Sequence, residues 1–303
     1  MAGLETTPEM FDLRMSEEVR PLFDAVKKFI TEEVDPHTNE FFRLGEGREE
    51  RWGYGEGQLE LLDSLKTKAK EQGLWNFFLP DAETGEGLKN LDYAYIATEL
   101  GKNPIASQSL NCSAPDTGNM EVLERVGTPE QKEQWLTPLL NGEIRSAYAM
   151  TEPDIPSSDA KNISCSAILD GDEWVINGQK IWTSAGQFAN WIFVLCRTDK
   201  EAPKHKGISF LLCQVDQPGI EMRPIKMLSG ESDFNETFFT DARTAKENVV
   251  GEINGGWAVA MTLLGYERGE SAATMPIMFR YEVDKLLELA KDKGLSNDPV
   301  IRQ

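Results

Sequence analysis

Hydrophobic positions follow a helical period through the first half of the chain. Between residues 19 and 30 the apolar side chains recur every three or four positions, after Ser16 as a candidate N-cap. The same period returns over residues 59–72 and 91–100, and residues 44–58 are a charged, glycine-rich loop. The pattern therefore predicts amphipathic helices separated by a long loop.

A second type of signal marks the next helix. Thr128 precedes Pro129, and Gln131 stands three positions after the threonine. A hydroxyl at the N-cap, proline at the first helical position and glutamine at the third are typical of a capping box. We expect this helix to end near Gly142.

From about residue 147 the hydrophobic period changes from 3.6 to 2, which is typical of strands. Residues 163–169 alternate, and Asp170-Gly171 is expected to turn the chain. The next strand is expected to end in a hairpin at Asn177-Gly178, a dipeptide favoured in tight turns. Further strands are predicted at residues 191–197 and 207–215, with a polar loop between them.

Helical periodicity returns at Gly256, with interruptions expected at Gly265 and Gly269 and a further helix expected to open at Asp298-Pro299. The pattern predicts an α+β protein that is mostly α. The expected domains are an N-terminal helical domain (1–146), a small central β domain (147–255) and a further helical segment (256–303).

Composition narrows the functional classes. A net charge of −20 spread along 303 residues disfavours nucleic acid as a partner. No apolar stretch approaches the roughly 20 residues needed to span a bilayer, and the N-terminus does not resemble a secretory signal. The four cysteines are widely spaced and favour free, buried thiols, with disulfides as the alternative. A cytoplasmic location is the expectation.

Several common catalytic sites find no support. The chain lacks the glycine-rich phosphate motifs GxGxxG and GxxxxGK[ST], and it lacks a GxSxG nucleophile elbow. The histidines are His37 and His205, both in polar surroundings, so a histidine triad or zinc site is disfavoured. Acid–base chemistry would then depend on carboxylates, Tyr, Lys or a cofactor.

Two segments carry the strongest functional signal. Residues 148–159, YAMTEPDIPSSD, are rich in hydroxyls and turn-forming residues, and residues 177–184, NGQKIWTS, place a Trp beside two hydroxyl side chains. The first supplies hydrogen-bonding groups and the second an aromatic plate. Together they favour a site for a flat, phosphate-bearing cofactor. The alternative is that the aromatics are core residues and the serines ordinary turn residues.

The pair resembles the flavin-binding signature of the acyl-CoA dehydrogenases, and the resemblance covers nearly the whole chain. Residues 111–120, NCSAPDTGNM, are similar to the subgroup named acyl-CoA dehydrogenase 10 and 11 in vertebrates. Residues 286–303 look more like bacterial members. The resemblance implies the acyl-CoA dehydrogenase fold, in which the central β domain is a small β-barrel and residues 256–303 are the beginning of a C-terminal helical bundle. Full-length members continue beyond the position of Gln303, so the chain is expected to be C-terminally incomplete.

The resemblance implies FAD as the cofactor and assigns roles residue by residue. The residues implied to bind FAD are Tyr148, Met150, Thr151, Ser157, Ser158, Trp182, Thr183 and Ser184. Trp182 would pack on the flavin and Ser184 would hydrogen-bond near its reactive nitrogen. The serine-containing segment is one residue longer than the family pattern and has no glycine, so Ser157 and Ser158 both stay candidates. Ser158 and Arg268 are implied to contact the substrate.

The implied reaction is α,β-dehydrogenation of an acyl-CoA thioester, in which a carboxylate removes the α-proton and the β-hydride goes to flavin N5. Glu267 occupies one of the two positions that the family uses for this base. The other position would lie beyond Gln303. The alternative for Glu267 is a solvated helix glutamate.

The resemblance also implies partners: an electron-transfer flavoprotein as acceptor, a homodimer or homotetramer, and a place in fatty-acid β-oxidation. Two other functions stay open. One is an acyl-CoA oxidase or desulfinase-like relative, and the other is a non-catalytic flavin- or CoA-binding subunit of a hetero-oligomer.

Overall fold

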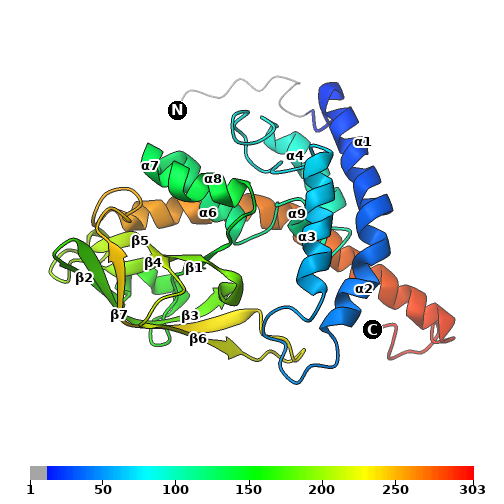
Figure 1. The fold of residues 1–303 in the computed structure, drawn as a ribbon. Coiled ribbons are helices and arrows are strands. Elements are labelled where there is room, and N and C mark those ends of the chain that lie inside the picture. The colour runs from blue at the N-terminus through cyan, green and yellow to red at the C-terminus, as the bar shows by residue number, and fades with distance from the viewer. Residues whose placement is uncertain (1–11) are drawn as a thin grey trace, which may run out of the picture. The chain divides into compact units, whose positions relative to one another are not determined.

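The computed structural model describes residues 12–303, apart from the side chains of residues 157–158 and 267–273. Its helices are α1 (Arg20–Phe29), α2 (Asp35–Gly45), α3 (Gln58–Glu71), α4 (Asn90–Leu100), α5 (Ala106–Ser109), α6 (Asp116–Val126), α7 (Pro129–Gln131), α8 (Thr137–Leu140) and α9 (Gly256–Asp292). Its strands are β1 (Ser146–Ala149), β2 (Ser166–Asp170), β3 (Glu173–Ser184), β4 (Trp191–Arg197), β5 (Ile208–Gln214), β6 (Ile220–Ile225) and β7 (Phe234–Ala245) (Figure 1). The α+β class expected from the sequence is confirmed.

The chain forms two compact units. One, which we call the helical unit, comprises residues 12–39, 65–110 and 270–303. The other, the sheet unit, comprises residues 40–64 and 111–269.

In the helical unit, α1 buries Val26 and Phe29 and packs against α4. Ser16 takes the predicted N-cap position, before the short helix Glu17–Val19, but its side chain does not cap that helix. Ser16 donates its N–H and its hydroxyl to the carboxylate of Asp92, at 2.7 and 2.9 Å, and makes no side-chain bond to the helix start. Asp92 is buried, so the serine serves a long-range contact that periodicity cannot reveal.

In the sheet unit, seven strands form one curled sheet in the order β1-β4-β2-β3-β7-β6, with β5 on the other edge of β4 (Figure 1). β1 and β4 run parallel, whereas β3 and β7 form a long antiparallel pair. One face carries the hydrophobic core, which includes Trp174, Ile176, Val194 and Leu211. Helix α6 packs against β1.

Predictions about a helix cap, a turn and the cysteines are confirmed. The capping box forms as expected, with Thr128 and Gln131 exchanging side chain-to-backbone hydrogen bonds. The turn at Asp170-Gly171 joins β2 to β3, and Gly171 takes a left-handed φ of 65° there. All four cysteines are buried and free.

The hairpin predicted at Asn177-Gly178 is wrong, because β3 runs straight through it. The register against β7 shifts between Ile176 and Gly178, so the dipeptide forms a bulge instead of a turn. A Cβ at Gly178 would lie 2.7 Å from the Cα of Cys165, closer than real Cβ contacts come. Glycine is needed here for close backbone approach.

Two other predictions need correction. β2 begins at Ser166, not at residue 163, because the N–H groups of Ser164 and Cys165 donate to the carboxylate of Glu152 instead of to a strand. Helix α9 continues through Gly265 and Gly269 without a break. A single glycine costs a helix only about 1 kcal/mol, which a long helix absorbs.

Candidate functional site

The two predicted cofactor segments meet in the sheet unit. The loop after β1 lies against the second half of β3, where the N–H of Ile181 donates to the carbonyl oxygen of Thr151 at 2.9 Å. The loop then folds back on itself, with the N–H of Ile155 donating to the carbonyl of Glu152. The sequence separates these segments by about 30 positions, and the sheet brings them into direct contact.

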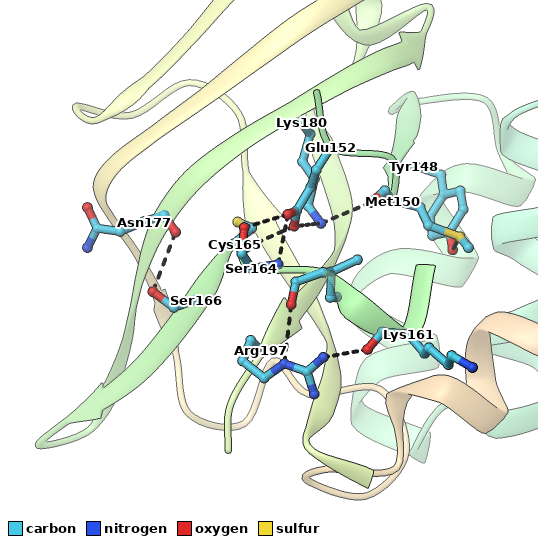
Figure 2. A network of polar contacts seen from close by, with 11 residues as sticks. Tyr148, Met150, Glu152, Lys161, Ser164, Cys165, Ser166, Asn177, Lys180 and Arg197 are labelled. Carbon is cyan, nitrogen blue, oxygen red and sulfur yellow. Dashed lines mark hydrogen bonds and ion pairs between the residues drawn. The ribbon is translucent and has the colours of Figure 1, made fainter. Parts of the chain in front are cut away.

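A buried ion pair joins the same two segments (Figure 2). Lys180, in β3, donates from Nζ to Oε1 of Glu152 at 2.9 Å and to the carbonyl oxygen of Met150 at 3.0 Å. The Lys180 side chain is fully buried and that of Glu152 is 4% exposed. The other oxygen of Glu152 accepts from the N–H and the hydroxyl of Ser164, both at 2.7 Å, and Oε1 also accepts from the N–H of Cys165.

These contacts determine the charge state of Glu152. Burial alone would raise the pKa of this carboxyl, since it disfavours the ionised form. The nearby ammonium of Lys180 and the N–H groups of Ser164 and Cys165 act in the opposite direction and outweigh it. The pKa of Glu152 therefore lies below its usual range, and the carboxylate stays ionised at neutral pH.

Trp182 stands on unusual backbone. Its φ is +64°, in the left-handed region of backbone conformation that residues other than glycine rarely adopt. It lies where the register of β3 against β7 shifts, between Lys180 and Thr183. The indole is 52% exposed and meets the ring of Phe234 edge-on, with centroids 6.0 Å apart. The interpretation of Trp182 as a core aromatic is therefore wrong, because a large apolar ring is held outward at a conformational cost.

The two hydroxyl residues after Trp182 lie differently. Ser184, the last residue of β3, is exposed. Thr183 is buried, and its hydroxyl accepts a hydrogen bond from that of Thr237 at 3.1 Å. The structure thus presents Ser184 and directs the Thr183 hydroxyl toward β7.

A cavity of about 420 Å³ opens beside Trp182. The residues that line it are Thr151, Glu152, Pro153, Asp154, Ile155, Pro156, Ile181 and Trp182. It therefore lies between the two segments singled out by the sequence. Its volume falls within the ~300–1,000 Å³ typical of small-molecule sites.

Tyr148 and Met150 lie near this cavity in the chain but are not among its lining residues. The Tyr148 hydroxyl donates to the sulfur of Met150 at 2.8 Å, and the Tyr148 ring stacks on Phe210 with centroids 5.7 Å apart. Both residues are half-buried. Tyr148 thus lies on the sheet face opposite to its core-facing neighbours Ala147 and Ala149.

Four predicted site residues fall outside the described side chains. They are Ser157, Ser158, Glu267 and Arg268. The backbone of Glu267 and Arg268 is part of α9. Their roles stay predictions.

Sequence reasoning missed Lys180 and Asn235. The signal for Lys180 was available: it follows Trp174 and Ile176 at even spacing on β3, so it is a lysine at an inward strand position. Such a lysine requires a buried acid as partner. Asn235, fully buried at the start of β7, gave no comparable signal.

The residues present fit a flavin nucleotide. The exposed Trp182 offers a stacking surface, the adjacent cavity is lined by Trp182 and Thr151, and Ser184 is exposed. Among the described residues, no group of three or more His, Cys, Asp or Glu is arranged to hold a metal ion. Nor does the described part of the chain contain a helix long and apolar enough to cross a membrane.

Comparison with known proteins identifies two domains of one family in this chain. Residues 16–143 match the acyl-CoA dehydrogenase N-terminal domain and residues 147–242 match the acyl-CoA dehydrogenase middle domain. Acyl-CoA dehydrogenase family member 10 of Mus musculus is 40% identical over 274 residues, which is 87% of this chain. The chain spans only 25% of that relative's length.

Solved structures share the fold. One described as an acyl-CoA dehydrogenase from Mycobacterium abscessus is 37% identical with a TM-score of 0.80, over 94% of this chain and 71% of that one. An acyl-CoA dehydrogenase from Bacillus anthracis complexed with FAD is 26% identical with a TM-score of 0.71, over 97% of this chain and 48% of that one. The order of helical and sheet segments, the joined motifs and these matches lead to one conclusion: the chain belongs to the acyl-CoA dehydrogenase family.

Proposed function

We propose that this protein catalyses the FAD-dependent α,β-dehydrogenation of an acyl-CoA thioester. The observation that carries the proposal is the outward indole of Trp182, held on left-handed backbone beside a cavity that the Thr151 segment completes. Exposing a large aromatic ring in a strained conformation is costly unless a ligand covers it. A flat ring system is the ligand that such a plate suits.

The chain's own residues would divide the work as follows. Trp182 supplies a stacking surface, and Thr151 and Ser184 supply hydrogen-bonding groups beside it. Tyr148 and Met150 support the loop from the sheet, and Ser157 or Ser158 would serve the pyrophosphate or the substrate. Thr183 contributes through its backbone, since its hydroxyl is committed to Thr237.

FAD, when bound, supplies the hydride acceptor for the reaction. Glu267 would take the α-proton of the thioester on a carboxylate oxygen, because neither His37 nor His205 belongs to the described site. Arg268, its neighbour on α9, would contact the acyl-CoA. Both assignments rest on the family pattern.

Further parts of the proposal concern the setting of the reaction. They are an electron-transfer flavoprotein as electron acceptor, a homodimer or homotetramer, a cytoplasmic location and a role in β-oxidation. Each follows from the likeness to the family. Each can be tested separately from the chemistry.

The flavin content of the purified protein tests the first requirement of the proposal, that the chain binds FAD. We expect the purified protein to be yellow and to release one FAD per chain on denaturation. A colourless protein that takes up no FAD on reconstitution would refute the proposal. A protein that binds FAD but is not reduced by any acyl-CoA would favour the non-catalytic subunit, and rapid reoxidation by O₂ after reduction would favour an oxidase.

A further inference from the structure

Asn235 is a fully satisfied junction between three segments of the sheet unit. Its Nδ2 donates to the carbonyl oxygen of Thr183 at 3.1 Å and to Oε1 of Gln187 at 2.7 Å. Its Oδ1 accepts from Nε1 of Trp52 at 2.6 Å. The side chain is completely buried, so losing any of these bonds would leave a polar group unpaired in the interior.

The junction holds a strained turn. Thr183 lies between Trp182 and Ser184, and the backbone is left-handed at Trp182 and again at Ala185, where φ is 52°. Such conformations persist only where the surrounding contacts fix them. Asn235 donates to the carbonyl oxygen of Thr183, which lies between these two positions. The N–H of Ala185 donates to the carbonyl oxygen of Asp233 at 2.9 Å.

Trp52 brings a distant segment to this turn. It belongs to the glycine-rich loop between α2 and α3, which gave no functional signal in the sequence. The same loop makes a second contact, in which Tyr54 stacks on Phe188 with centroids 4.4 Å apart and planes inclined by 29°. A backbone bridge between Arg51 and Glu231 gives a third. The loop is thus attached to Phe188, shortly after the turn that follows Trp182, and to Asn235 and Glu231 near the start of β7.

We propose that Trp52 and Asn235 are positioning residues that hold the turn of residues 182–185 in the conformation that presents the Trp182 indole and the Ser184 hydroxyl to the cofactor. The inference rests on the proposed function for the identity of the ligand. Neither residue lines the cavity, so each acts through the turn: Trp52 through Asn235, and Asn235 through the Thr183 carbonyl.

A double-mutant cycle on FAD affinity tests this coupling. Trp52→Phe keeps the aromatic bulk and removes the N–H donor, and Asn235→Ala removes the junction. Because each loses hydrogen bonds that hold the turn, we expect each to weaken FAD binding by about three- to tenfold. The double variant should bind FAD no more weakly than Asn235→Ala alone, because the indole N–H that Trp52→Phe removes is bonded to Asn235.

Trp174→Phe is the matched control. Its indole N–H donates to the carbonyl oxygen of Lys246 at 3.3 Å, far along β3 from the turn, and its ring is buried. It should leave FAD affinity unchanged. Multiplicative losses in the cycle, or unchanged affinity in both single variants, would overturn the proposal.

Amide hydrogen exchange provides a readout that needs no cofactor. In the FAD-free protein, Trp52→Phe should speed exchange at Ala185, Phe188 and Ala189, whose N–H groups are bonded within or next to the turn. Trp174→Phe should not. Unchanged exchange at these amides in Trp52→Phe would contradict positioning even if the wild type binds FAD. Faster exchange in Trp52→Phe, together with a wild type that binds no FAD, would sustain the positioning and refute only the proposed function.

Discussion

Lys180 places its ammonium 2.9 Å from Oε1 of Glu152, and the two side chains tie the loop after β1 to the strand that carries Trp182. The pair is out of water, so its Coulombic attraction is set against a large desolvation cost. Removing one partner leaves the other charge buried and uncompensated. The ion pair therefore fixes the position of the loop against β3 more than it adds to the net stability of the fold.

Glu152→Gln should lower the free energy of unfolding by about 3–5 kcal/mol, because Lys180 would lose its charged partner in the interior. Urea denaturation followed by circular dichroism measures this. Glu173→Gln is the control: Glu173 pairs with Arg243 at 3.1 Å on the surface, and such pairs contribute about 0–1 kcal/mol. Equal losses in the two variants would contradict the account.

The lowered pKa of Glu152 predicts a pH dependence. A carboxyl whose pKa is lower in the folded than in the unfolded state stabilises the fold above the unfolded value, near 4.3 for glutamate. That contribution is lost as pH falls from there through the lowered folded value. The difference in unfolding free energy between wild type and Glu152→Gln should therefore shrink below about pH 4. A pH-independent difference would show that Glu152 does not titrate as described.

The left-handed backbone at Trp182 predicts that glycine is more stable than alanine at this position, the reverse of the usual order. In ordinary strands or helices glycine is less stable than alanine by about 0.5–1 kcal/mol. At a φ of +64° alanine carries a steric cost of about 1–2 kcal/mol that glycine avoids. We expect Trp182→Gly to be more stable in urea than Trp182→Ala, and both to bind FAD more weakly than wild type. Greater stability of the alanine variant would mean that residue 182 is not left-handed.

Gly178→Ala should destabilise the sheet unit, since the new methyl would lie within 3 Å of the backbone and side chain of Cys165. Strain of this kind typically costs 1–3 kcal/mol. Gly265→Ala is the comparison, because a Cβ there meets no atom within 4 Å and the residue is helical. It should stabilise the protein by up to about 1 kcal/mol. Thermal denaturation of both variants decides the sign of each effect.

Local signals predicted the elements whose cause is local. The capping box at Thr128 and the turn at Asp170-Gly171 form because the residues that determine them are neighbours in the chain. Asn177-Gly178 has the same local signal as a hairpin, but the close approach of Cys165 decides its conformation. That contact arises only once β2 and β3 pair.

The site was predicted in part for the same reason. Its two segments were found because each carries distinctive residues, and their direct contact through Ile181 and Thr151 is a product of the sheet. The burial of Thr183 and the hydrogen bonds of Asn235 depend on β7. No pattern in the sequence predicted that β7 pairs with β3. The contact of Trp52 with Asn235 was not predicted, because a glycine-rich loop has no hydrophobic periodicity that indicates where it packs.

Glu267→Gln should separate binding from chemistry. Glutamine keeps the shape of the side chain and an acceptor oxygen but cannot take a proton. The variant should bind FAD and acyl-CoA nearly as well as wild type and fail to reduce the flavin, so that the loss falls on the chemical step. Stopped-flow absorbance in the absence of oxygen measures it. Reduction at the wild-type rate would remove Glu267 from the mechanism.

The central claim is tested most directly by anaerobic titration of the purified, FAD-loaded protein against a panel of acyl-CoAs of different chain length and branching. Flavin absorbance reports the result without any electron acceptor. We predict that at least one acyl-CoA bleaches the flavin with one equivalent per chain and is converted to the enoyl-CoA. A flavin that stays oxidised with every acyl-CoA in the panel would contradict the account.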